Sequence, residues 1–139
     1  RYFAELEETI RSRGLSSDIT FTGNRGDLKE IMSISALVLS LSSRPESFGR
    51  TVLEALALGV PVVAYDHGGV SEILGTMLPA GLVGLKDLPR LIEVCTGFLQ
   101  QAPAVGELPG KFMLETMLSG TLDVYCSLLG EPRARQNVS

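Results

Sequence analysis

The segment that decides the fold is residues 44–64, RPESFGRTVLEALALGVPVVA. It begins as a loop with a glutamate, an aromatic residue and a glycine, continues as an apolar helix, and ends in an apolar strand over residues 60–64. Glu54 lies inside the apolar helix, where burying an ionised side chain is costly unless the charge has a partner. Glu46, in the loop, and Glu54 are therefore the first candidate functional residues.

Outward from this segment, apolar patterns alternate between extended and helical. We expect strands over residues 19–22, 36–41, 60–64 and 82–85. We expect helices over residues 1–13, from Asp27 onward, over 50–58 and 70–74, from Asp87 to about Leu99, and over 118–129, where Gly120 is a candidate break. This alternation predicts an α/β domain with a parallel, Rossmann-like sheet and right-handed crossovers.

Capping signals and composition mark the boundaries of these elements. Asp27 with Glu30 matches a capping box, and Gly14 is a natural C-cap. Residues 102–110 are rich in Pro and Gly and predict a loop. We therefore divide the chain into a domain over residues 1–130 and a polar C-terminal tail over residues 131–139.

Composition excludes several classes of protein. The chain has 139 residues, 45% hydrophobic, with a net charge of −4 and a pI near 5.0, which argues against a general nucleic-acid surface. No apolar run reaches the roughly 18–20 residues of a membrane span, and no signal peptide is visible. Because the chain starts at Arg1 and immediately with a helix, we expect a piece of a longer protein. We also expect that protein to be cytoplasmic.

Metal and disulfide chemistry is not expected. Cys95 and Cys126 lie far apart in apolar helical contexts, which is typical of buried free thiols. One histidine and no close cysteine pair argue against a structural zinc site.

Ligands of open parallel sheets bind beyond the carboxyl ends of the strands. Three loops are expected there, over residues 23–26, 42–49 and 66–69, and they should converge on one crevice. The residues before the helix leave backbone N–H groups without helical partners, so they form a site for an anion or hydroxyl. Gly49 lets a ligand approach the backbone closely.

Two carboxylates frame this loop and helix. Glu46 can accept hydrogen bonds from neighbouring hydroxyls, as sugar recognition needs. Glu54 follows by about 12 Å of helical rise. That distance is too long for the carboxylate pair of a retaining hydrolase, which is about 5 Å. The pair could instead hold a sugar and a ribose at two ends of one ligand.

Simpler interpretations remain open for each residue. Thr51-x-x-Glu54 matches a capping box, so Glu54 could only cap the helix. Glu46 could be a solvated loop residue, and Gly68-Gly69 an ordinary turn. Four further polar residues could simply be surface or turn residues without a ligand: Arg25, Arg44, Arg50 and His67.

Taken together, three segments closely resemble the group 1 (family 4) retaining glycosyltransferases of GT-B fold. They are residues 45–55, PESFGRTVLEA; residues 59–64, GVPVVA; and residues 68–73, GGVSEI. Glu46 and Glu54 reproduce that family's E-x7-E motif. The likeness runs from about Gly14 to Leu74, and residues 122–129 are more loosely similar to the family's C-terminal helix.

The resemblance implies a C-terminal, donor-binding domain, one half of a GT-B fold with its N-terminal edge missing. Glu46 would be the catalytic residue and would hold donor-sugar hydroxyls, and Glu54 would bind the ribose. The other implied donor contacts are backbone amides of Ser47, Phe48 and Gly49 at the sugar, the region of Arg50 and Thr51 at the diphosphate, and Gly23 and Asn24 near the base. Glu72 would support the site. No metal or cofactor is implied.

The implied function is the transfer, with retention, of a hexose-type sugar from a nucleotide-diphosphate sugar to an acceptor hydroxyl. A glycan, lipid or small-molecule acceptor would bind through an absent N-terminal domain, so the chain alone is expected to be inactive. Peripheral membrane association of the full-length protein is left open. The alternatives are a non-catalytic interaction module of the same fold and a GT-B epimerase or phosphorylase. The family's basic pair and the glycine-rich stretch after Leu74 are not matched.

Overall fold

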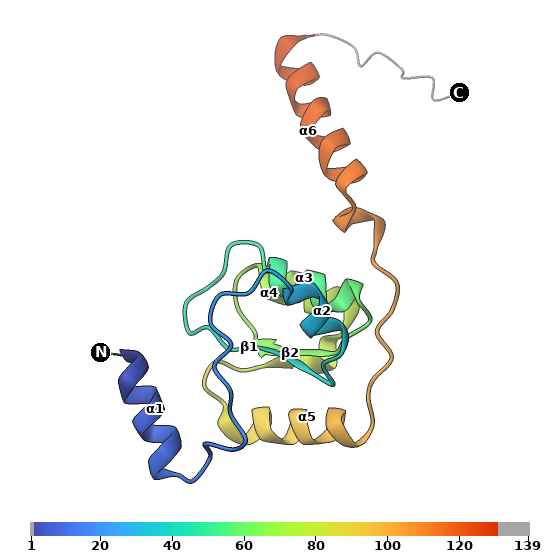
Figure 1. Cartoon of the computed structure of the whole chain (residues 1–139). Helices are drawn as coiled ribbons and strands as arrows, with labels where there is room; N and C mark the ends of the chain where they lie inside the picture. The colour runs from blue at the N-terminus through green and yellow to red at the C-terminus, as the bar shows by residue number, and fades with distance from the viewer. Residues whose placement is uncertain (1, 131–139) are drawn as a thin grey trace.

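The structure is a computed structural model that describes residues 2–130. At its centre is a parallel three-stranded sheet in the order β1 (Val38–Ser40), β2 (Val62–Tyr65), β3 (Leu82–Val83). Val38 pairs with Val62 and Ala64 with Leu82. The Rossmann-like α/β fold predicted from the alternation of elements is confirmed (Figure 1).

Helices cover both faces of the sheet (Figure 1). On one face lie α2 (Leu28–Ser33), α3 (Arg50–Ala57) and α4 (Gly69–Met77), and on the other lies α5 (Leu88–Gln100).

The central strand β2 is buried along its whole length because both of its faces are covered. Val62 and Ala64 pack with α2, α3 and α4 in the larger apolar cluster. Val63 packs with Val83 and the buried side of α5 in a second cluster. Successive strand side chains alternate between faces, so one apolar strand supplies both halves of the core.

Helix α5 begins as predicted. The carboxylate of Asp87 accepts a hydrogen bond from the backbone N–H of Arg90 at 3.1 Å. This bond satisfies one of the N–H groups that a helix start leaves unpaired.

The strand expected over residues 19–22 is wrong: this segment has no regular secondary structure. A β-branched and aromatic pattern becomes a strand only beside another strand that shares its hydrogen bonds, and no strand of the described residues lies next to it. Phe21 instead contacts Phe3, with 4.8 Å between ring centroids, and remains 43% exposed.

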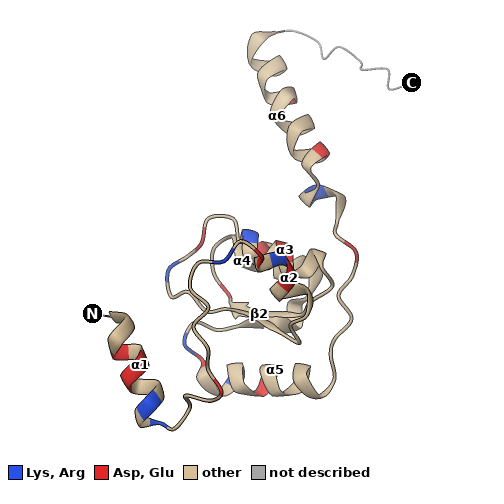
Figure 2. Ribbon diagram, viewed as in Figure 1, with Lys and Arg blue, Asp and Glu red and all other residues tan. Residues whose placement is uncertain are grey.

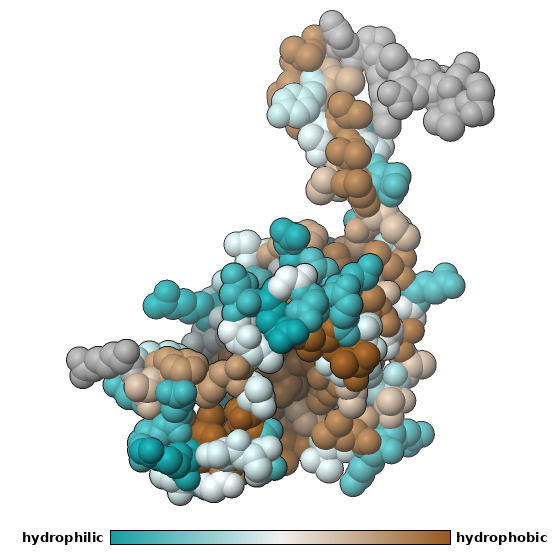
Figure 3. All heavy atoms as spheres, in the orientation of Figure 1, coloured by the Kyte–Doolittle hydropathy of each residue, from teal (hydrophilic) through white to brown (hydrophobic). Residues whose placement is uncertain are grey.

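The two terminal helices lie outside the core. Helices α1 (Tyr2–Ser12) and α6 (Leu114–Leu129) contain no buried residue. Helix α6 projects away from the body and carries hydrophobic side chains along its visible face (Figures 1 and 3). The break expected at Gly120 does not occur, because glycine only weakens a helix whose neighbours favour it.

The remaining elements are short. Two 3-10 turns, η1 (Pro79–Gly81) and η2 (Gly110–Phe112), precede β3 and α6. The loop predicted before Gly110 contains no helix or strand over residues 102–109. Within residues 2–130, no helix is long and apolar enough to cross a membrane. The predicted tail, residues 131–139, lies outside the described residues.

Both cysteines are free thiols, as predicted, but each is half-buried rather than buried. Burial raises the pKa of the Cys95 thiol, which makes the reactive thiolate scarcer at neutral pH. Cys126 lies on α6, a helix that contains no buried residue.

Replacing Gly97 with alanine is expected to stabilise the fold by about 0.5–1 kcal/mol. Gly97 is exposed in the last turn of α5, and an added Cβ would meet nothing within 4 Å. Alanine lowers the backbone entropy of the unfolded chain without a clash. Urea unfolding monitored by circular dichroism measures the change, and a lower midpoint for Gly97→Ala would contradict the prediction.

Candidate functional site

The candidate site is built around the loop between β1 and α3, residues 42–49, which we call the signature loop. Its first turn is closed by Ser42, whose hydroxyl donates to the carbonyl of Arg44 at 3.0 Å and accepts from the Arg44 N–H at 3.2 Å. Its middle is attached to the residues after β2, because the Gly69 N–H donates to the Glu46 carbonyl at 2.9 Å. Glu46 itself is exposed.

The segment after β2, residues 66–69, approaches the signature loop so closely that only glycine fits. A Cβ on Gly68 would lie 2.4 Å from the Glu46 carbonyl oxygen, and Gly68 adopts φ 61° and ψ −153°. A Cβ on Gly69 would lie 2.6 Å from the Phe48 carbonyl oxygen. We call residues 66–69 the glycine turn; its role is to let two backbones touch.

Helix α3 begins immediately after the signature loop. Gly49 precedes it with φ 83°, and no side chain caps the helix. The Leu53 N–H donates to the Gly49 carbonyl at 3.0 Å, which leaves the N–H groups before it without a helical acceptor. These donors, together with the helix dipole, favour an anion at the start of α3.

The capping-box interpretation of Glu54 is wrong. The helix starts at Arg50, so Thr51 is inside it and not at its N-cap. Glu54 lies on the solvent side of α3, with its side chain 53% exposed and 3.5 Å from the guanidinium of Arg50. The charge therefore carries no burial cost, and it is open to a ligand.

The expected 12 Å of helical rise between Glu46 and Glu54 is also wrong. Glu46 precedes the helix, and only the part from Arg50 to Glu54 is helical, which gives about 6 Å of rise. The two carboxylates are still separated by the turn at Gly49.

A cavity of about 840 Å³ opens beside α3. One wall comes from the signature loop and α3: Phe48, Arg50, Leu53 and Glu54. The opposite wall comes from the C-terminal segment: Lys111, Phe112, Met113, Leu114, Thr116 and Met117. Sequence reasoning missed this wall, because nothing in its local pattern indicates that it returns to α3.

Lys111 attaches this C-terminal segment to α4. Its ammonium group lies 3.0 Å from the Thr76 hydroxyl and 3.7 Å from the Glu72 carboxylate. Glu72, predicted to support the site, is thus the ion-pair partner of Lys111, which lines the cavity. Acidic and basic residues lie together around α2 and α3 (Figure 2).

A smaller cavity, about 490 Å³, lies on the α2 side of Glu54. Its lining combines Glu54 with four other residues: Lys29, Met32, Ala57 and Leu58. Glu54 therefore stands between two openings, one toward α2 and one toward the C-terminal segment.

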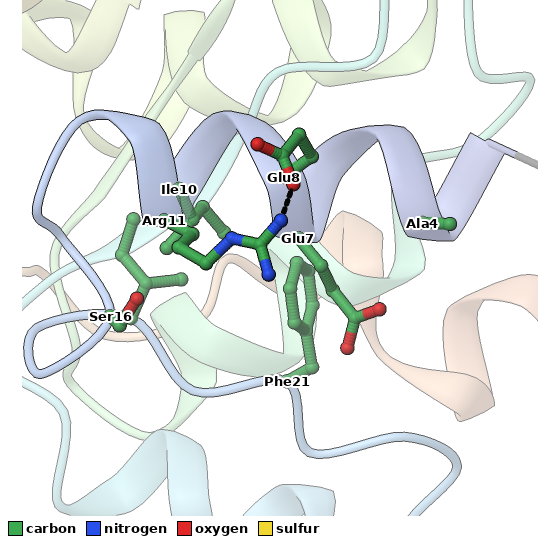
Figure 4. A pocket seen from close by; sticks show the side chains of 8 residues that line it. Ala4, Glu7, Glu8, Ile10, Arg11, Ser16 and Phe21 are labelled. Carbon is green, nitrogen blue, oxygen red and sulfur yellow. Dashed lines mark hydrogen bonds and ion pairs between the residues drawn. The ribbon is translucent and has the colours of Figure 1, made fainter.

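A third cavity, about 570 Å³, lies between α1 and the segment that follows it (Figure 4). The lining includes Glu7 and Glu8 of α1 and Phe21. Glu8 forms an ion pair with Arg11, which lies on the same helix and also lines the cavity. It contains none of the predicted site residues.

Of the three loops expected to converge, the structure joins two. The signature loop and the glycine turn share backbone hydrogen bonds. Among residues 2–130, no hydrogen bond or ion pair joins Gly23 or Asn24 to the signature loop. Residues 19–22 form no strand, so the sheet does not direct this loop toward the signature loop.

The capping box predicted at Asp27 is only half right. Asp27 occupies the N-cap of α2, but its carboxylate makes no capping bond. It accepts two hydrogen bonds from the guanidinium of Arg25, at 2.7 and 2.5 Å. This bidentate contact lowers the pKa of Asp27 below its usual range.

Replacing Arg25 with leucine is expected to raise the pKa of Asp27 toward the ordinary value of about 3.9. A lowered pKa in the folded state favours folding above the unfolded-state pKa, and this contribution is lost as the pH falls through the folded-state pKa. In Arg25→Leu, this contribution of Asp27 to the pH dependence of stability should disappear. A carboxyl NMR titration measures it, with Arg13→Leu as control; an unchanged Asp27 pKa in Arg25→Leu would contradict the assignment.

Comparison with known proteins places this geometry in a family. The family model for "Glycosyl transferases group 1" matches residues 1–84. The lipopolysaccharide core biosynthesis mannosyltransferase LpsB of Rhizobium meliloti (strain 1021) is 32% identical over 115 residues, 81% of this chain and 32% of that protein. The mannosyltransferase LpcC of Rhizobium leguminosarum bv. viciae is 33% identical over 138 residues, 94% of this chain and 39% of its own.

Solved structures agree. Anabaena Alr3699/HepE in complex with UDP superposes with a TM-score of 0.66 at 31% identity, covering 71% of this chain and 27% of that one. The same protein in complex with UDP-glucose gives the same values. The chain thus spans well under half of each relative's length. It belongs to the group 1 glycosyltransferases and has the Rossmann-like α/β fold found in GT-B enzymes.

Proposed function

We propose that this chain is the donor-binding half of a retaining glycosyltransferase, which moves a hexose-type sugar from a nucleotide-diphosphate sugar to an acceptor hydroxyl. One observation carries the proposal. The E-x7-E segment is an exposed loop that leads into an uncapped helix start, and it is held in place by the glycine turn.

The proposed donor contacts follow the segment from loop to helix. Glu46 accepts hydrogen bonds from donor-sugar hydroxyls, and the amides of Ser47, Phe48 and Gly49 contact the sugar. The helix start at Arg50 and Thr51 binds the diphosphate, where unpaired N–H groups and the helix dipole stabilise negative charge.

The nucleoside is proposed to lie beyond the diphosphate. Glu54, exposed on the first turns of α3, accepts hydrogen bonds from the ribose. Gly23 and Asn24 are proposed near the base, on the strength of the family resemblance alone.

Catalysis in this scheme is electrostatic. As the bond to the diphosphate breaks, negative charge grows on the leaving group, and donors already aimed at that position stabilise it without reorganising. Glu46 orients the sugar as the bond breaks. No metal is required by the proposal.

The acceptor is proposed to bind through a further domain, because the chain covers only a part of each relative. The two Rhizobium relatives are named as mannosyltransferases of lipopolysaccharide core biosynthesis, and HepE is bound to UDP-glucose. These names support a hexose donor for this chain. The proposed acceptor is a glycan, a lipid or a small molecule.

Isothermal calorimetry with UDP-glucose, GDP-mannose and ADP-glucose tests the proposal. Saturable binding of one nucleotide sugar, competed by its nucleoside diphosphate, is the expected result. Absence of heat and of any thermal shift with all three donors would contradict it.

A further inference from the structure

The single histidine of the chain connects the two loops that form the site. His67 lies in the glycine turn, two residues after the end of β2. Its ring Nε2 lies 2.8 Å from the backbone carbonyl oxygen of Ser42, at the start of the signature loop. Its backbone N–H donates to the Tyr65 carbonyl at 3.0 Å, which ties the ring's own position to the sheet.

The chemistry of this contact requires a proton on Nε2 of the ring. A carbonyl oxygen only accepts hydrogen bonds, so Nε2 must carry the proton. The other nitrogen, Nδ1, is buried and has no hydrogen-bond partner among the described residues. In the opposite tautomer the lone pair of Nε2 would face the lone pairs of the Ser42 carbonyl, and the contact would be repulsive.

From this geometry we propose that His67 is a positioning residue for Glu46. The Nε2–H group donates to the Ser42 carbonyl, and the Ser42 hydroxyl makes two hydrogen bonds with the backbone of Arg44. Two residues later the Glu46 carbonyl is bound by the Gly69 N–H. The glycine turn therefore makes two hydrogen bonds to the signature loop. The side chain of His67 donates one of them, and the backbone of Gly69 donates the other.

This inference rests on the proposed function only in its last step. The hydrogen bond fixes the loop whether or not a donor binds. If Glu46 holds the donor sugar, a loosened loop lowers donor affinity, because the loop must then be ordered at the moment of binding.

The first test needs no ligand. Long-range ¹⁵N NMR of the imidazole in the 139-residue chain reports which ring nitrogen is protonated, and one histidine makes the signal unambiguous. We expect the Nε2–H tautomer. The Nδ1–H tautomer would overturn the proposal.

The second test compares variants of His67. In His67→Gln the amide nitrogen can reach the position of Nε2 and donate to Ser42, whereas in His67→Asn it is too short, and in His67→Leu no donor remains. We expect the Gly69 amide to exchange about 5-fold faster in the Asn and Leu variants and to be near normal in Gln, as one lost hydrogen bond implies. Equal exchange in all four proteins would overturn the proposal.

The same variants, titrated with the nucleotide sugar that the unmodified chain binds, test the last step. Affinity should fall about 5-fold in His67→Asn and His67→Leu and recover in His67→Gln. If the unmodified chain bound none of the three nucleotide sugars, the proposed function would fail, while the tautomer and the Gly69 exchange would still decide the role of His67.

Discussion

Replacing Gly68 with alanine is expected to destabilise the folded chain by about 2–6 kcal/mol. The backbone of Gly68, at φ 61° and ψ −153°, lies in a region that is essentially restricted to glycine, at a cost of about 1–3 kcal/mol for other residues. The new Cβ would also lie 2.4 Å from the Glu46 carbonyl oxygen, which is backbone and cannot rotate away. Forcing the two segments apart adds about 1–3 kcal/mol.

Gly59→Ala is the matched control. Gly59 also has a positive φ, 76°, but a Cβ there would meet nothing within 4 Å. Gly59→Ala should lower the stability of the fold by only about 1–2 kcal/mol, the strain of a left-handed backbone in alanine. Urea unfolding of both variants measures the difference, and equal losses of stability would show that the contact between the glycine turn and the signature loop is not tight.

Replacing Glu46 or Glu54 with glutamine is expected to weaken nucleotide-sugar binding by about 10- to 100-fold each. Hydrogen bonds to a charged group contribute about 1.5–3 kcal/mol, and 1.4 kcal/mol corresponds to tenfold in affinity. Both side chains are exposed, so folding should be unaffected. The exposed Arg50–Glu54 pair adds little to stability, because solvent screens it.

Nucleoside diphosphates distinguish the two carboxylates. If Glu54 binds the ribose, Glu54→Gln should weaken both the nucleotide sugar and its nucleoside diphosphate. If Glu46 binds the sugar, Glu46→Gln should weaken only the nucleotide sugar. Glu107→Gln, exposed in the loop before η2 and without a side-chain bond in the described chain, is the control for charge. Unchanged donor affinity in the double variant would refute the proposed site.

Much of the fold could be predicted from local patterns. The apolar strand at residues 60–64, the helix that contains Glu54 and the cap at Asp87 each follow from residues close together in sequence. Their alternation determines a parallel sheet, and the E-x7-E spacing together with its flanking glycines and the following strand indicated the family, which the similarity to known proteins shows.

The sequence by itself thus determined the order of the elements, the parallel sheet and the two carboxylates of the signature segment, because hydrophobic period and capping act over a few residues. Only the tertiary structure decided that residues 19–22 have no strand partner, that Glu54 faces solvent, and that Lys111 closes a cavity over α3. It also decided that His67 reaches Ser42, 25 residues away. Such contacts depend on where separate elements meet in space, and no local pattern encodes that distance.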